Sequence, residues 1–310
     1  MAAQDSVAPD FDLLTVAGEP PAPAQHEPRD AAVVLPENSL VANFFSVALQ
    51  CQDRFDVIVS FAYDWLAYYL TPFFTTPLAH VVGMSSLSDA VDRVLATVVQ
   101  RQPGRLAVHT RAQAATFAFG DQLALVGNGI DLSRYRFQPV AEPALAWVAR
   151  IAPEKGLEDA AAAAAASGLP LRVWGVVEDE AYWATIRSAF PETVLSYRGF
   201  LPTEELQAEL GRCRALLATH KWVEAFGNVV VESLAVGVPV ITYERGGPAE
   251  LVRHGETGFL VEPDSVAGLT GAISRVTQLD RAACRRQAEQ EYSIPALGDR
   301  FERWLEPMVG

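Results

Sequence analysis

Short apolar runs alternate with amphipathic segments through the second half of the chain. A strand that is buried on both faces of a parallel sheet reads as a continuous apolar run, whereas the helix that follows it repeats its apolar positions every three to four residues. Six runs fit such strands: 144–150, 170–177, 193–200, 215–220, 238–243 and 258–263. The pattern predicts a doubly wound α/β sheet in this half.

The first half shows the same alternation over a shorter length. Its strand candidates are 55–63, 77–84, 105–110 and 123–130. Residues 136–144 carry two prolines and no periodicity, which is typical of a linker. We therefore predict a first domain over residues 1–140 and a second over residues 141–290. A C-terminal helix is predicted over residues 291–310, with packing toward the first domain as one option.

Composition is consistent with two packed cores and argues against a nucleic-acid partner. The chain has 310 residues, of which 50% are hydrophobic, and single cores stop growing at roughly 250 to 300 residues. Its net charge is −14, from 38 acidic and 24 basic side chains. Such a charge opposes binding to a phosphate backbone, so we expect no nucleic-acid partner.

The cysteines and the apolar segments indicate the compartment. Cys51, Cys213 and Cys284 are far apart and include no Cys-x-x-Cys pair, which favours neither a disulfide framework nor a zinc site. The first residues lack the basic and apolar regions of a secretory signal, and no run of eighteen apolar residues occurs. We expect a cytoplasmic protein without a transmembrane segment.

The stretch "HKWVEAFGNVVVESLAV" at 220–236 is the strongest candidate for chemistry. It lies between two predicted strands, so a helix must begin near Asn228, although three consecutive valines alone would favour a strand. Gly227 and Asn228 would then present the unpaired N–H groups of the first helical turn, which bind anions. Glu224 and Glu232 are eight positions apart and could face one site, whereas an isolated pair of this kind is usually a solvated helix face.

The distribution of positive charge points to the same end of the sheet. Lysine occurs only at Lys155 and Lys221, and arginine supplies the rest. A genome that prefers arginine codons explains most of this bias. Arg150 and Lys155 nevertheless follow the predicted strand at 144–150, where they could bind an anionic group. A surface ion pair is the alternative for Arg150 taken alone.

Several segments together resemble a known family. The segment at 224–232 resembles the Glu-x7-Glu motif of retaining glycosyltransferases of the GT-B fold, family four. Four other segments are also similar to segments of that family. In chain order they are "NGIDLSRY" at 128–135, "WVARIAPEKGLEDA", "GFLPTEEL" and "ERGGPAELVRHGETGFLVEPD". The resemblance covers most of the chain from about residue 55. More weakly, "FAYDWLAYYLTPFF" and "KWVEAFGNVVVE" resemble bacterial UDP-glucose:tetrahydrobiopterin glucosyltransferases.

The resemblance implies an α/β GT-B fold, with two Rossmann-like doubly wound domains facing a cleft. Family members open with a strand, a glycine-rich loop and a helix, and nothing of the kind precedes residue 30. The first domain is therefore expected to lack its first β-α unit, and the chain to bind its donor while transferring sugar poorly.

The resemblance also assigns residues to the donor. Arg150 and Lys155 would bind the diphosphate, Glu232 the ribose hydroxyls, and Glu224 the donor sugar in a catalytic role. The remaining donor-binding residues implied are Phe226, Gly227, Asn228 and Val229. The amides near Gly246 and Gly247 could contribute.

On the acceptor side, the resemblance implies a catalytic His80, and Asp64 and His109 near the acceptor. A satisfied core histidine is the alternative for both histidines. Asp10 and Asp12 form an Asp-x-Asp pair without a preceding strand, so we expect neither a metal site nor another cofactor.

The reaction implied is retaining transfer of a sugar from a nucleoside-diphosphate sugar, such as UDP-glucose, to an acceptor hydroxyl. The acceptor would be a glycan or a small molecule such as a pterin. Two alternatives remain open from the sequence: a sugar-nucleotide-binding protein without transferase activity, and a GT-B sugar-nucleotide epimerase.

Overall fold

The computed structural model describes residues 1–3, 6 and 12–309; Asp10 of the Asp-x-Asp pair lies outside them. The chain divides into two compact units, Met1–Val126 with Phe301–Gly310, and Gly127–Arg300. The division falls ahead of the predicted linker because residues that follow it pack on the second unit. Tyr135 is buried in the core of that unit, and the amide of Gln138 donates to the carbonyl of Val236 at 3.0 Å.

The second unit is built on a six-stranded parallel sheet. Its strands are β7 (Leu145–Val148), β8 (Leu171–Trp174), β9 (Leu195–Tyr197), β10 (Ala215–Ala218), β11 (Val240–Tyr243) and β12 (Gly258–Val261). All six predicted strands are confirmed. They pair in the order β12-β11-β10-β7-β8-β9, so the direction of winding reverses between β7 and β10. This is the strand order of a dinucleotide-binding Rossmann sheet.

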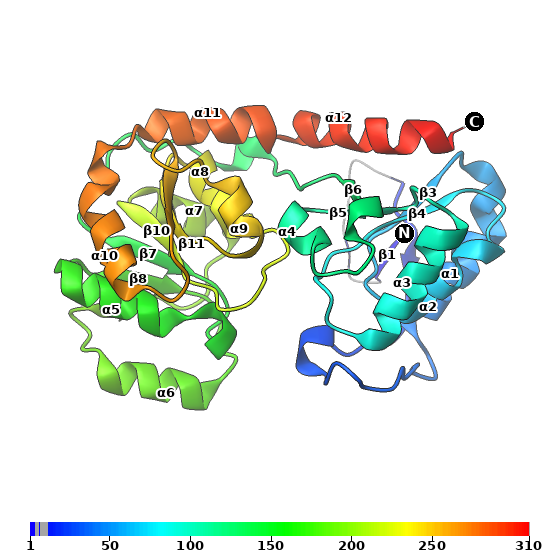
Figure 1. The fold of residues 1–310 in the computed structure, drawn as a ribbon, viewed down its shortest axis with the longest axis horizontal. Coiled ribbons are helices and arrows are strands. Elements are labelled where there is room, and N and C mark those ends of the chain that lie inside the picture. Colours follow the sequence, from blue (N-terminus) through cyan, green and yellow to red (C-terminus); the bar gives the residue numbers. More distant parts are fainter. Residues whose placement is uncertain (4–5, 7–11, 310) are drawn as a thin grey trace. The chain divides into compact units, whose positions relative to one another are not determined.

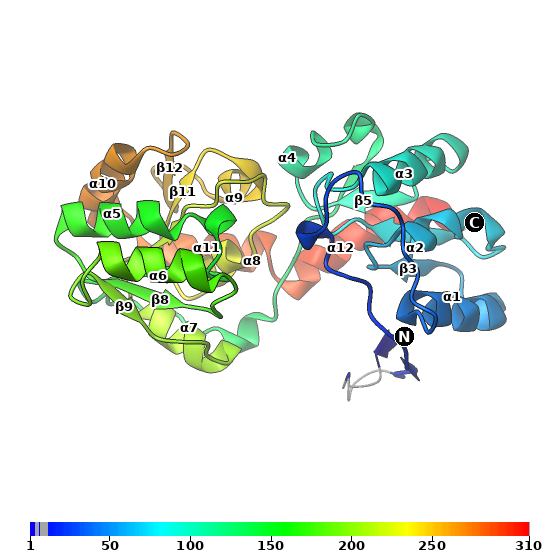
Figure 2. The ribbon, with the colours of Figure 1, turned by 90° about the horizontal axis from the view of Figure 1, so that it is seen from below.

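Helices cover both faces of this sheet (Figures 1 and 2). One face carries α5 (Leu157–Ser167), α6 (Glu180–Ala189) and α10 (Val266–Arg275). The other face carries α7 (Thr203–Gly211), α8 (Asn228–Ala235), α9 (Gly246–Leu251) and α11 (Arg281–Glu291). Alternate strand residues serve the two layers, since Leu145 and Trp147 belong to one core and Ala146 to the other.

Helix α7 begins differently from what its sequence suggests. Threonine is a common capping residue, but Thr203 is the first helical residue and Pro202 occupies the capping position, without a side-chain hydrogen bond. Proline already has the extended backbone that a cap needs, so the helix begins one residue earlier than it would with Thr203 as its cap. Glu204 and Glu205 in the first turn remain favourable for the helix dipole.

The first unit has a smaller parallel sheet of four strands. These are β3 (Ile58–Ser60), β4 (Leu78–Val81), β5 (Leu106–Val108) and β6 (Ala124–Leu125), as predicted. They pair in chain order, β3-β4-β5-β6, without a reversal, and β1 (Ala2–Ala3) and β2 (Thr15–Val16) form a separate pair. The helices of this unit are α1 (Leu40–Cys51), α2 (Trp65–Tyr69), α3 (Asp89–Arg101) and α4 (Arg111–Ala114).

The C-terminal helix, α12 (Ile294–Leu305), supplies part of the core of the first unit. Trp304 is buried against Ala79 and Val81 of β4 and Ala107 of β5. Its indole Nε1 donates to the carbonyl of Gly104 at 2.8 Å, so the polar atom of this large side chain is satisfied. The other face of the sheet packs on apolar residues of α3. In the described part of the chain, no helix combines the length and apolar character required to cross a bilayer.

Candidate functional site

The reversal of strand order marks where the second unit can bind a ligand. The connections that follow β7 and β10 leave in opposite directions, and a crevice forms there at the carboxyl ends of the strands. Arg150 and Lys155 follow β7, and Glu224 and Gly227 follow β10. The predicted donor-binding residues of this unit therefore lie in these two connections or in α8, which extends the second.

Backbone contacts hold the two connections together. Gly156 has a φ of 65°, and a Cβ at this position would lie 2.1 Å from the carbonyl oxygen of Thr219. The Thr219 hydroxyl is 2.7 Å from the carbonyl oxygen of Gly156, and the amide of Lys221 donates to the carbonyl of Glu154 at 2.7 Å. Only glycine permits such an approach, so the local sequence fixes Lys155 beside the segment that carries Glu224.

Lys155 and Glu224 form an ion pair at the centre of this region. The Nζ of Lys155 is 2.5 Å from Oε2 of Glu224, and the indole of Trp222 donates to the same oxygen at 3.1 Å. The Lys155 Nζ also lies 4.7 Å from the centre of the Trp222 ring. The structure thus brings together one residue predicted to bind the diphosphate and one predicted to bind the sugar. Trp222 is a contact that sequence reasoning missed.

Arg150 lies in a different set of contacts. Its guanidinium pairs with Glu154 at 3.1 Å and with Glu178. Lys221, the other lysine, pairs with Glu158 at 2.6 Å and with Asp159 at 3.3 Å. The two cations predicted to share a diphosphate, Arg150 and Lys155, are each paired with carboxylates of this chain.

Helix α8 begins at Asn228, as predicted, and Gly227 determines how it begins. Gly227 has a φ of 95°, and a Cβ there would lie 2.7 Å from Cγ of Pro248. The amide of Gly247 donates to the carbonyl of Glu224 at 2.7 Å, which ties the start of α9 to the same loop. The side chain of Asn228 accepts from Asn128 at 2.8 Å. The N–H groups of the first turn of α8 are the part of this helix suited to an anion.

Glu232 lies one turn into α8, largely buried between two partners from other elements. The hydroxyl of Tyr135 and Nε2 of Gln207 donate to its two carboxylate oxygens, each at 3.4 Å. Burial raises the pKa of the Glu232 carboxyl, and these two hydrogen bonds oppose the shift. Sequence reasoning did not single out Tyr135 or Gln207. The only signal was their presence in segments that resemble the family, "NGIDLSRY" and "GFLPTEEL" with its continuation.

Two other predicted donor residues are largely structural in position. The Phe226 side chain is buried in the core, with its ring 6.2 Å from that of Tyr292 in an edge contact. Val229 is half-buried and packs against the same core. Contact of either residue with a donor stays a prediction.

The predicted residues of the first unit have internal partners. His80 is fully buried in β4, 2.9 Å from the Thr71 hydroxyl and edge-on to the Tyr68 ring. Burial lowers the pKa of His80 to about 3, so the ring is neutral near pH 7. Asp64 caps α2 by accepting from the amide of Leu66 at 2.8 Å, and burial raises the pKa of its carboxyl. Their catalytic and acceptor-binding roles stay predictions.

His109 follows β5, and its backbone amide donates to the side chain of Gln113 at 2.7 Å. Its role near an acceptor is likewise a prediction. Within residues 1–3, 6 and 12–309, no group of three or more histidine, cysteine or carboxylate side chains is arranged to hold a metal ion.

Comparisons with known proteins identify the family. The model of the family described as "Glycosyl transferases group 1" matches residues 134–292. Glycogen synthase of Mycobacterium tuberculosis is 32% identical over 259 residues, which cover 73% of this chain and 61% of that protein. D-inositol 3-phosphate glycosyltransferase of Rhodococcus erythropolis is 29% identical over 255 residues, covering 73% and 54%. The chain thus spans roughly half to three fifths of the length of these relatives.

Solved structures show the same fold. HepE of Anabaena, crystallised with UDP and glucose, superposes with a TM-score of 0.71 at 18% identity, covering 84% of this chain and 81% of that one. Sucrose-phosphate synthase of Thermosynechococcus elongatus superposes with a TM-score of 0.70 at 19% identity, covering 87% and 77%. The predicted GT-B architecture is confirmed. This chain belongs to the glycosyl transferases group 1 family.

Proposed function

We propose that the chain transfers a sugar from a nucleoside-diphosphate sugar to an acceptor hydroxyl with retention of configuration. The observation that carries the proposal is the Lys155–Glu224 ion pair, which lies beside the first turn of α8 at the reversal of strand order. It is the kind of place where a diphosphate binds in such sheets. UDP-glucose is the first donor to test, because the structural relative HepE was solved with UDP-glucose.

The ion pair gives a physical account of donor binding. A diphosphate carries more charge than Glu224 and would compete for Lys155, with the N–H groups at Gly227 to Val229 adding donors. Glu224 would then be free to accept hydrogen bonds from hydroxyls of the donor sugar. Glu232, at the other side of the first turn of α8, would accept from the ribose hydroxyls.

The chemical step would depend mainly on the leaving group. The bond between the anomeric carbon and the diphosphate oxygen breaks while the acceptor oxygen bonds to the same face of the sugar, and the acceptor proton passes to the departing diphosphate. Negative charge then develops on the diphosphate, where Lys155, Arg150 and the α8 terminus would stabilise it. The proposal assigns this neutralisation to protein groups and places acceptor binding in the first unit, with Asp64 and His109 as candidates.

The two lysines of the chain provide a matched test of donor binding. Lys155→Ala should weaken UDP binding by about 10- to 100-fold, since a hydrogen bond to a charged group contributes about 1.5 to 3 kcal/mol. Uridine binding should change little. Lys221→Ala, which removes the other lysine from nearby carboxylate partners, should change UDP affinity less than about threefold. Equal losses for UDP and uridine in Lys155→Ala would contradict the assignment.

Transfer itself is tested with UDP-glucose and a panel of glycan and small-molecule acceptors that includes a reduced pterin. The coupling constant of the anomeric proton in the product distinguishes retention from inversion, and an α-linked product is expected from the α-linked donor. UDP binding without product on any acceptor would support the alternative of a sugar-nucleotide-binding protein. Epimerised or hydrolysed donor without an acceptor would support the epimerase alternative.

A further inference from the structure

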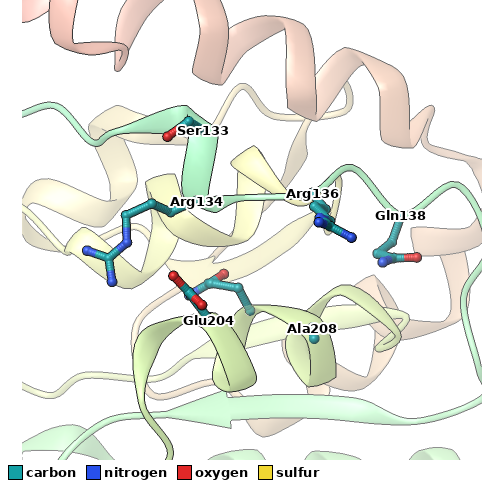
Figure 3. A pocket seen from close by; sticks show the side chains of 7 residues that line it. Ser133, Arg134, Arg136, Gln138, Glu204 and Ala208 are labelled. Carbon is teal, nitrogen blue, oxygen red and sulfur yellow. The ribbon is translucent and has the colours of Figure 1, made fainter.

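The second unit has a pocket that the proposed reaction does not use. Its volume is about 350 Å³, and it lies between residues 133–138 and helix α7. Figure 3 shows Arg134 and Arg136 on the first of these segments, with Glu204 and Ala208 on α7. Glu232 is not among the residues that line it.

The pocket is lined by two arginines, Arg134 and Arg136, whose guanidinium groups form no ion pair among the described residues. Both side chains are exposed, and neither guanidinium forms a hydrogen bond with a described residue. Besides the hydrogen bonds from Ser133, the charge of Arg134 helps to lower the pKa of the Asp131 carboxyl, and it opposes the burial that raises the pKa of Glu232, without direct contact. By contrast, Arg150, Arg245 and Arg253 are each paired with carboxylates. In a chain of net charge −14, two unpaired guanidiniums at one pocket favour an anionic ligand, and guanidinium groups match phosphate oxygens.

A buried amide provides a second, independent observation. Gln207 lines the pocket and is only 2% exposed. Its Nε2 donates to Glu232, whereas its Oε1 is buried without a hydrogen-bond partner. An unpaired buried acceptor costs about 1 to 3 kcal/mol, so a ligand group that donates a hydrogen bond to Oε1 would be favoured.

Two other groups that line the pocket can also accept hydrogen bonds from a ligand. Glu204 contributes an exposed carboxylate, which can only accept. The hydroxyl of Ser133 donates to Asp131 at 2.7 Å, so its remaining capacity is also to accept. The pocket therefore combines two cations with three acceptors, which complements a molecule that carries one anionic group and several hydroxyls.

We propose that this pocket is a binding site for a phosphorylated sugar, separate from the site of the nucleotide sugar. Arg134 and Arg136 bind the phosphate, and Gln207, Glu204 and Ser133 accept from the hydroxyls. Gln207 lines the pocket and also donates a hydrogen bond to Glu232. A ligand that donates a hydrogen bond to Oε1 therefore holds the amide with its Nε2 toward Glu232. Occupancy then changes nucleotide affinity; this coupling alone rests on the proposed function.

Calorimetric titration with ribose 5-phosphate tests the site directly, with ribose and inorganic phosphate as comparison ligands. We expect saturable binding of one equivalent of ribose 5-phosphate, at least tenfold tighter than either comparison ligand. Arg134→Ala and Arg136→Ala should each weaken it at least fivefold. Arg93→Ala, which removes an exposed arginine of α3 in the first unit, should leave it unchanged. Melting temperatures confirm that these surface variants fold.

Three results would overturn the proposal. The first is no saturable binding of ribose 5-phosphate, and the second is inorganic phosphate binding equally well. The third is binding that survives in both pocket variants but is lost in Lys155→Ala, which would place the ligand at the nucleotide site. The coupling is measured by repeating the titration in saturating UDP: a change of at least threefold is expected, and Gln207→Met should abolish it. If UDP does not bind at all, the proposed function fails while the pocket result stands.

Discussion

The two units share the same parallel β-α pattern, but the polar residues discussed above differ in their positions and contacts. In the second unit the strand order reverses between β7 and β10, and residues such as Lys155, Glu224 and Arg150 collect in the connections there. In the first unit the order β3-β4-β5-β6 runs without a reversal. The strand order therefore determines where a crevice forms at the carboxyl ends of the strands, independently of the side chains there.

In the first unit, the side chains of Gln113, His80 and Asp64 form hydrogen bonds within the unit. The side chain of Gln113 donates to the carbonyls of Val82 and Met84 at 2.6 and 3.0 Å, and accepts from the amide of His109. His80 is buried against Thr71, and Asp64 caps a helix. In the second unit, Lys155 and Arg150 instead form ion pairs with carboxylates that a charged ligand could replace. Four predictions test whether this contrast is real.

The largest effect is expected from the tryptophan that α12 contributes to the first unit. Trp304→Ala should lower the free energy of unfolding by about 3 to 5 kcal/mol, because it removes a buried aromatic ring and leaves a cavity. UDP affinity should stay within twofold of the wild type, since every proposed nucleotide contact lies in the second unit. Chemical denaturation and calorimetry measure the two quantities.

Trp304→Phe is the milder control, because it keeps one aromatic ring and loses the five-membered ring of the indole with its hydrogen bond to Gly104. It should cost about 1 to 2 kcal/mol. A large loss of UDP affinity in a well-folded Trp304 variant would show that nucleotide binding is not confined to the second unit, and would break the contrast.

The next effect concerns the backbone that starts α8. Gly227→Ala should lower stability by about 2 to 3 kcal/mol, because a φ of 95° is unfavourable for alanine and the new Cβ would meet Pro248. Gly168→Ala is the matched control: its φ is 66°, and no atom lies within 4 Å of the added Cβ, so about 1 kcal/mol is expected. UDP affinity should fall about tenfold only in Gly227→Ala. Equal effects of the two substitutions would mean that the contact with Pro248 does not matter.

Several features of the fold and of the candidate site could be predicted from the sequence. The strands follow from apolar periodicity, and α8 was placed correctly despite Val229 to Val231, because two flanking strands require a crossover between them. Lys155 could be selected because lysine is scarce in this chain. Local pattern and family resemblance were enough for these features.

The partners of the candidate residues could not be predicted in this way. Tyr135 meets Glu232 across 97 positions of sequence, and Gln207 reaches the same carboxylate from α7. Glu224 pairs with Lys155, although the two were assigned to different parts of the ligand. Such contacts depend on side-chain directions and on how strands and helices pack, which spacing along one chain does not encode.

A smaller effect is expected from the buried histidine of the first unit. Because His80 has a pKa lowered to about 3, the unfolded chain takes up a proton at this residue below about pH 6.5 while the folded chain does not. The stability from the neutral ring is fully present above that pH and is lost as the pH falls toward 3. Between pH 7 and pH 5 the wild type should lose about 2 kcal/mol from this source.

His80→Gln should remove this part of the pH dependence, whatever its effect on stability at pH 7. His254→Gln, at an exposed position of the second unit, should keep the wild-type slope. Unfolding curves at the two pH values measure the difference. Identical slopes for the wild type and His80→Gln would show that the ring is accessible to protons, and His80 would again be a candidate for direct participation in transfer.

The smallest and most specific effect is expected at Glu232. Its pKa is raised by burial, so the charged form is the less favoured one in the folded protein, and its contribution to stability decreases as the pH rises through that pKa. Glu232→Gln stays neutral and keeps a similar shape, so its melting temperature at pH 7 should equal or exceed that of the wild type. Its affinity for UDP should nevertheless fall about tenfold, because one neutral amide oxygen replaces two charged acceptors facing the ribose.

Uridine provides the control, since it retains the ribose and lacks the diphosphate. Glu232→Gln should weaken uridine and UDP equally, whereas Lys155→Ala should weaken only UDP. Wild-type affinity should also decrease as the pH falls toward the raised pKa of Glu232, because protonation removes its acceptor capacity, and Glu232→Gln should not show this decrease. A lower melting temperature with unchanged nucleotide affinity would instead identify Glu232 as a structural carboxylate held by Tyr135 and Gln207, and the second unit would then use this polar group as the first unit uses its own.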